Sequence, residues 1–82
     1  MIQQLPPWEW FDMPKPIKGM IMWGTVQPPF QYIVSYDEQY KQWGASVAGY
    51  DHNTTDYLEL GHDFRNRALA EDACFNHYLS MR

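Results

Sequence analysis

The chain has 82 residues, a formal net charge of −4 and a single cysteine. This length corresponds to one domain with a thin hydrophobic core, and one cysteine excludes an internal disulfide. The acidic balance argues against a nucleic-acid-binding surface, which needs clustered lysine and arginine. No stretch approaches the ~20 apolar residues of a membrane-spanning helix, and the N-terminal residues lack the pattern of a signal peptide. We therefore expect a cytoplasmic protein.

Residues 1–19 predict an extended arm that precedes the folded domain. Its four prolines exclude a helix and are expected to break any strand pairing. The same segment carries Trp8, Trp10 and Phe11. Because rings of this size bury roughly 150–250 Å² each and are rarely left in water, we expect the arm either to lie across the domain or to dock on a partner.

The segment after the arm predicts a small antiparallel sheet of three to four strands. Residues 30–36 are the clearest strand, since their side chains alternate with a period of two. Residues 20–26 and 43–48 predict strands on either side of it. A short fourth strand is expected at 57–60 and is expected to end at Gly61.

Residues 66–81 predict a single C-terminal helix, capped by Asn66 or Asp63. On a helical wheel, one face consists of small or amphipathic residues and is expected to pack on the sheet; its members are Ala70, Cys74, His77, Tyr78 and Met81. Residues 20–82 are therefore expected to form one α+β domain.

A second apolar strip on the helix, formed by Phe75 and Leu79, points well away from the first. One flat sheet cannot easily cover both strips. We expect Trp8, Trp10 or Phe11 of the arm to pack over this second strip, because each group then leaves water.

The residues that could carry catalysis or bind a metal do not form a recognisable site. His52, His62 and His77 lack the tight ligand spacing of a zinc site, and His77 is expected to be a hydrogen-bonded structural residue on the core face. Cys74 lies in the apolar stripe, where a thiol has a raised pKa and is inert. No phosphate loop, triad or convergent carboxylate pair is present. We expect no catalytic residue, no cofactor and no metal.

Acidic residues are concentrated between Lys41 and Arg65, a stretch without lysine or arginine. If residues 57–60 form a strand, these carboxylates are expected to share one edge of the molecule and to face a basic partner. The alternative is a solvated face that keeps the protein in solution. The four residues are Asp51, Asp56, Glu59 and Asp63.

The order of motifs from Trp23 to Tyr78 resembles a small domain of uncharacterised phage and prophage proteins. The motifs are Trp23, Tyr32-Ile33-Val34, Trp43-Gly44-Ala45, Leu60-Gly61 with Phe64, and Ala73-Cys74-Phe75-Asn76-His77-Tyr78. The chain departs from the pattern by an extra residue between Gly61 and Phe64, and by Arg67-Ala68-Leu69-Ala70 in place of Thr-Leu-Glu-Glu. The resemblance implies a strand–strand–strand–helix fold and a mobile-element origin. It carries no established activity, although small acidic phage proteins are often inhibitors of host machinery, anti-CRISPR proteins among them.

These observations favour a non-catalytic phage-type accessory protein that binds a host protein complex with a basic surface and inhibits bacterial defence. Two alternatives stay open: a nucleic-acid-binding module that uses the strand aromatics Trp23, Tyr32, Tyr36 and Trp43, and a structural homo-oligomer. Neither a membrane nor a direct nucleic-acid contact is expected in the leading hypothesis, and a homodimer is compatible with it. The expected partner-binding residues are Trp8, Trp10, Asp51, Asp56, Glu59, Asp63, Phe75 and Leu79.

Overall fold

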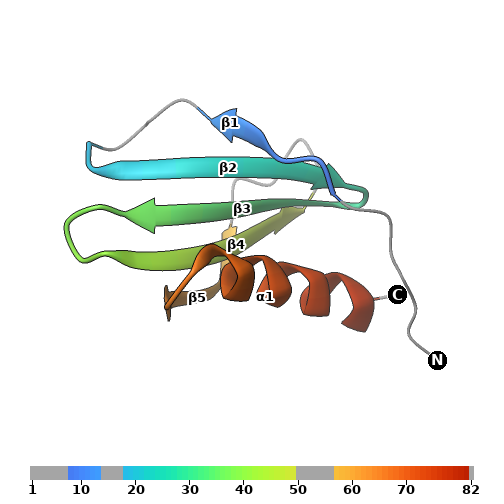
Figure 1. Ribbon diagram of the computed structural model, residues 1–82. Coiled ribbons are helices and arrows are strands. Elements are labelled where there is room, and N and C mark those ends of the chain that lie inside the picture. Colours follow the sequence, from blue (N-terminus) through green and yellow to red (C-terminus); the bar gives the residue numbers. More distant parts are fainter. Residues whose placement is uncertain (1–7, 14–17, 50–56, 82) are drawn as a thin grey trace.

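The computed structural model describes residues 8–13, 18–49 and 57–81. In this part of the chain, five strands form one antiparallel sheet in sequential order, and one helix covers one face (Figure 1). This architecture confirms the predicted α+β class. The elements are β1 (Phe11–Met13), β2 (Met20–Gln27), β3 (Phe30–Asp37), β4 (Gln42–Gly49), β5 (Tyr57–Phe64) and α1 (Arg67–Ser80).

Strand β1 corrects the expectation that the arm forms no strand pairing. Phe11, Asp12 and Met13 pair antiparallel with residues 22–24 of β2, which raises the number of strands to five. None of the three paired residues is a proline, so the prolines elsewhere in the arm do not prevent the pairing. The partner position Gly24 also matters, because a Cβ there would lie 3.0 Å from Met13 Sδ and 3.1 Å from Phe11 Cζ.

The core lies between the helix and the middle of the sheet. Side chains of a strand alternate between the two faces, and the pairing of β3 with β4 brings Tyr32 beside Val47 and Val34 beside Ala45. Ala70 and Cys74 of α1 complete this buried cluster. These two small residues let the helix approach β3, β4 and β5, which are the described strands that it packs against.

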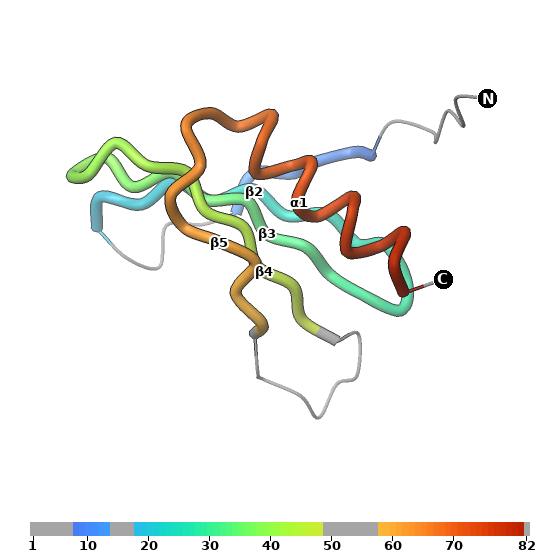
Figure 2. Tube along the Cα trace, turned by 90° about the horizontal axis from the view of Figure 1, so that it is seen from below, coloured from blue at the N-terminus to red at the C-terminus, as the bar shows by residue number. Residues whose placement is uncertain are grey.

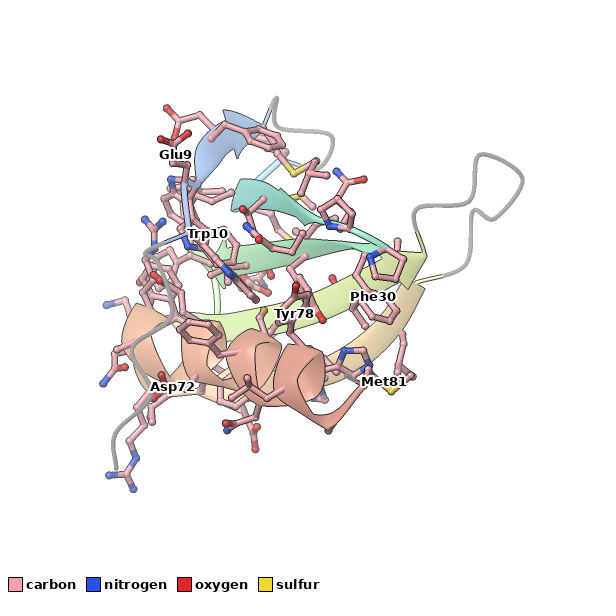
Figure 3. The ribbon with its side chains drawn as sticks, turned by 90° about the vertical axis from the view of Figure 1, so that its right-hand side faces the viewer. Glu9, Trp10, Phe30, Asp72, Tyr78 and Met81 are labelled. Atoms are coloured by element: carbon pink, nitrogen blue, oxygen red, sulfur yellow. The ribbon has the colours of Figure 1, made fainter. Side chains whose placement is uncertain are left out.

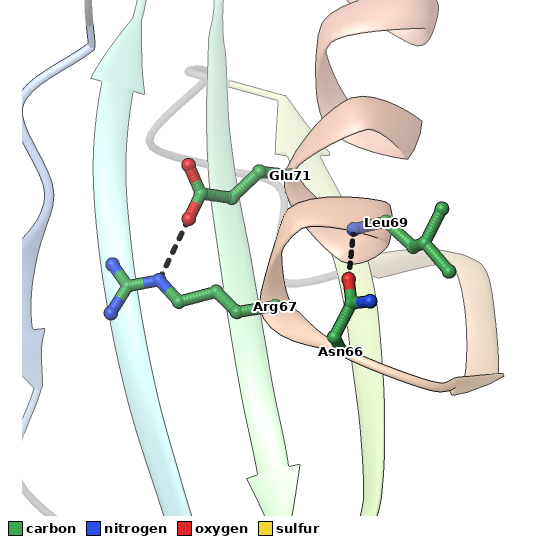
Figure 4. Close-up of polar contacts among 4 residues, drawn as sticks. All are labelled: Asn66, Arg67, Leu69 and Glu71. Atoms are coloured by element: carbon green, nitrogen blue, oxygen red, sulfur yellow. Dashed lines mark hydrogen bonds and ion pairs between the residues drawn. The ribbon is translucent and has the colours of Figure 1, made fainter.

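The N-terminus of α1 is fixed by Asn66, as the sequence predicts. The Asn66 side-chain oxygen accepts a hydrogen bond from the Leu69 backbone N–H at 2.9 Å (Figure 4). This contact satisfies one of the backbone donors that a helix leaves unpaired at its start. At the other end, Met81 was expected on the core face, but this expectation is wrong. The helix ends at Ser80, and the Met81 side chain is 60% exposed.

The arm packs against both β3 and α1 through Trp8. Trp8 stacks on Tyr32 with ring centroids 5.2 Å apart, and its ring lies 4.6 Å from that of Phe75. Tyr78 meets the same tryptophan edge-on at 5.5 Å. The expectation that an arm aromatic packs on the second helix strip is therefore confirmed at Phe75, whereas Leu79 stays 45% exposed. Figure 2 shows α1 and the arm on neighbouring parts of the sheet.

Strand β5 is longer than the sequence predicts and continues through Gly61. The pairing with β4 shifts register on both sides of Ala45, the partner of Gly61. Such bulges bend a strand and change the direction of its side chains. They allow β5 to extend to Phe64, whose ring packs against the core cluster.

Replacing Gly61 with alanine is expected to destabilise the fold by about 1–3 kcal/mol, the usual cost of overpacking. A Cβ at this position would lie 2.6 Å from Phe64 Cζ, and the ring cannot move freely because it packs on the core. Urea unfolding followed by tryptophan fluorescence measures the effect. The matched control is Gly19→Ala, where φ is positive (87°) but no atom lies within 4 Å of the new methyl group, so its cost comes from backbone conformation alone. Equal losses in the two variants would show that backbone conformation, not the Phe64 ring, determines the cost.

Candidate interaction surface

Cys74 and His77 are structural residues of the core. Cys74 is fully buried, and burial raises the pKa of its thiol to about 12, so the thiol stays protonated and is a poor nucleophile. The Tyr32 hydroxyl and His77 Nδ1 are 2.9 Å apart, which confirms the predicted hydrogen-bonded histidine. The edge of Phe30 lies against the same imidazole.

The remaining described histidine, His62, has a mostly exposed side chain. His62 Nδ1 and Glu59 Oε1 form a hydrogen-bonded pair on β5, with both side chains more than half exposed. Across the described ranges, no three histidine, cysteine or acidic side chains come together as metal ligands would. His52 lies outside the described residues.

The strand aromatics are largely occupied by contacts within the protein. Tyr32 is completely buried, and Trp23 stacks on Trp43 with ring centroids 5.5 Å apart. The Arg67 guanidinium lies 4.5 Å from the centroid of Trp23. Its Nε donates a hydrogen bond to Glu71 Oε2 at 2.7 Å (Figure 4), which holds it over the ring. The rings that a single-stranded nucleic acid would need for stacking are thus already paired with one another or with Arg67.

Several of the predicted partner-binding residues are used inside the fold. Trp8 and Phe75 pack on each other, and Trp10 is half-buried beside Trp8 and 6.0 Å from Arg67. Leu79 is exposed. Of these four apolar candidates, Leu79 is therefore the one whose side chain is most available to a partner.

The structure describes only part of the predicted acidic edge. Glu59 and Asp63 are both exposed on β5, an edge strand of the sheet, whereas Asp51 and Asp56 lie outside the described residues. Glu59 is near the start of β5 and Asp63 near its end. The two carboxylates thus share one edge, with the His62 side chain hydrogen-bonded to the first of them.

Exposed apolar side chains are concentrated at one end of the molecule, where β2 ends, β5 begins and α1 finishes its last turn (Figure 1). Val26 is 40% exposed, Leu58 58% and Met81 60%, and both residues of the β2–β3 turn are exposed. Figure 3 faces this end, with Met81 and Phe30 on it. We call it the Pro28–Pro29 end, and its residues are Val26, Pro28, Pro29, Leu58, Leu79 and Met81.

The opposite end of the molecule has a different character. It is formed by the β3–β4 turn, where the Asp37 carboxylate accepts hydrogen bonds from the backbone N–H groups of residues 39 and 40. Lys18, Lys41 and Arg65 are exposed near this end. Tyr40 of this turn is also exposed, so this end combines charged side chains with one exposed ring, whereas four exposed aliphatic or methionine side chains lie at the Pro28–Pro29 end.

Sequence reasoning missed Val26, Leu58 and Met81 as surface residues. Each belongs to a regular apolar pattern, so the local sequence places each one with the core. The proline pair after β2 was a signal for an exposed turn. No signal in the sequence showed that β5 would form the edge of the sheet, or that α1 would end one residue before Met81.

Comparison with known proteins adds no assignment. The chain matches no protein-family model, no curated protein and no solved structure. Within the described residues, no helix has the length and hydrophobicity needed to cross a membrane.

Proposed function

We propose that this chain is a non-catalytic protein-binding module of phage type, which occupies a surface of a host protein complex and inhibits bacterial defence from within the bacterial cytoplasm. The observation that carries the proposal is the concentration of exposed apolar side chains at the Pro28–Pro29 end. Exposed apolar side chains that gather at one end of a molecule are a feature of protein interaction sites.

The composition of this end fits a protein partner. Leu58 and Met81 are more than half exposed, and such side chains can fill pockets on an opposing surface. Glu59 directly follows Leu58 on the edge strand, so its carboxylate lies at the same edge of the sheet but points to the opposite face. Its charge would raise the association rate with a basic partner, and salt would weaken this gain.

The interaction surface is tested by replacing Leu58 and Met81 together with serine. The tagged protein is purified from lysate of a bacterium that carries a defence system, and the proteins that come with it are identified by mass spectrometry. We expect the parent protein to recover a partner and this variant to recover at least about tenfold less of it. The reason is that hot-spot side chains contribute ~2 kcal/mol or more each. Phage plating efficiency in the same strain should fall in parallel.

The matched control replaces Tyr40 and Leu69, which are 67% and 43% exposed but lie outside the Pro28–Pro29 end. Their replacement with serine removes similar apolar surface and is expected to leave partner recovery and plating unchanged. Loss of the partner in the control, or its retention by the Leu58 and Met81 variant, would contradict the proposed contact. Recovery of the chain itself as the only partner would favour the homo-oligomer.

A further inference from the structure

One face of the sheet is covered by α1, and no described element lies on the other face (Figure 2). Cross-strand partners share a face, and the pairing places Gly24, Ile33 and Ser46 on the uncovered side, opposite to Tyr32 in the core. Within the described strands β2, β3 and β4, Asp37 is the only charged residue directed to this side, and its carboxylate is hydrogen-bonded in the β3–β4 turn. Depletion of charge is typical of the core of a protein interface.

A ridge and a hollow lie side by side on this uncovered face. One row of cross-strand partners begins with Met13 on β1 and Met22 on β2. The same row continues with Ser35 on β3 and Gly44 on β4. The methionine side chains are partly exposed, whereas the two small residues line two adjoining hollows of about 340 Å³ each. Two long side chains therefore stand next to space that the chain itself does not fill.

We propose that the uncovered face, centred on the row from Met13 to Gly44, binds the same face of a second copy of this chain. A two-fold axis that runs along the strands between β2 and β3 places the methionines of each copy over the hollow of the other. Methionine suits this role, because its flexible thioether side chain fills irregular gaps. The two sheets then pack face to face as in a β-sandwich.

Charge and area both favour a second copy as the occupant. Each chain has a net charge of −4, so two copies repel each other unless the surfaces in contact are neutral, as this face is. Four strands of up to eight residues cover on the order of 500 Å², since strands lie ~4.8 Å apart and rise ~3.3 Å per residue. Two such faces bury about 1,000 Å² in total, which is the lower limit for a specific interface.

This self-contact does not use the residues proposed to bind a host protein. Leu58 pairs with Val47, which belongs to the core on the helix side of the sheet, and Met81 follows the last residue of α1. Both side chains stay accessible in each copy of the dimer. The inference therefore stands independently of the proposed function.

The dimer is tested by light scattering after gel filtration, which is expected to give the parent protein the mass of two chains. Ser35→Lys brings a charge to the middle of the face, and its neighbour Gly44 leaves room for the longer side chain in a single copy. We expect the dimer to be at least about a hundredfold weaker by sedimentation equilibrium, because each lysine would be enclosed without a counter-charge. The matched control is Asn76→Lys, which adds the same charge to an exposed position of α1 and should leave the dimer intact.

A second measurement needs no substitution. Dilution of the parent protein with ¹³C-methyl-labelled methionine is expected to shift the signals of Met13, Met20 and Met22, whereas the signal of Met81 stays constant. A parent with the mass of one chain, or dilution shifts confined to Met81, would overturn the proposal. A Ser35→Lys variant that keeps the parent's near-ultraviolet circular dichroism and dimerises as tightly would overturn it as well. Because no host protein is present, these outcomes are distinct from those of the Leu58 and Met81 test.

Discussion

Replacing Trp8 with alanine is expected to lower the free energy of unfolding by about 3 kcal/mol, the lower end of the usual cost for a packed tryptophan. For a domain of this size, the melting temperature should then fall by at least about 10 °C. The reason is the number of rings that lose a neighbour: Trp8 contacts Tyr32, Phe75 and Tyr78, and the first of these is fully buried. Thermal unfolding followed by circular dichroism measures the shift.

The matched control for Trp8 is Phe11→Ala, which removes another aromatic ring from the arm. Phe11 is 46% exposed, and its ring lies over Gly24 on the other face of the sheet from this aromatic cluster. Its loss is expected to cost only about 1 kcal/mol, in the range of an ordinary substitution. If the two variants melt at the same temperature, Trp8 does not close the core, and the arm is available to a partner instead.

Raising the pH from 8 to 12 is expected to destabilise the protein through two buried groups. Burial raises the pKa of Tyr32 from 10.0 to about 12, and the pKa of Cys74 from 9.0 to about 12. The unfolded chain therefore releases these protons at lower pH than the folded chain. Their stabilising effect is complete below about pH 9 and is lost as the pH rises towards 12.

The size of this alkaline effect is on the order of several kcal/mol, since one pKa unit corresponds to about 1.4 kcal/mol. Urea unfolding at pH 8, 9, 10 and 11 measures it. Cys74→Ala removes the thiol and leaves Tyr32, so its stability should fall less steeply between pH 9 and 11 than that of the parent. Parallel curves for the two proteins would mean that the Cys74 thiol ionises as readily in the folded state as in the unfolded state.

The sequence by itself determined the parts of this protein that depend on local periodicity. Alternating side chains identified β3, because adjacent residues of a strand face opposite sides whatever lies around them. The helical wheel placed Ala70 and Cys74 in the core, and a side-chain oxygen at Asn66 can cap a helix using only the three residues that follow. The same helical wheel places His77 on the core face and the Cys74 thiol inside the core, where it is unreactive.

The tertiary structure alone decided which residues reach the surface and which are covered. The pairing of β1 depends on the space above Gly24 in another strand, and the continuation of β5 depends on where the Phe64 ring meets Gly61. The exposure of Leu58 and Met81 follows from the position of β5 at the sheet edge and from the end of α1 at Ser80. These properties arise from contacts between segments distant in the chain, and a local pattern does not encode which segment becomes the neighbour. The interaction surface that we propose is therefore a product of packing, whereas the core beneath it is already visible in the sequence.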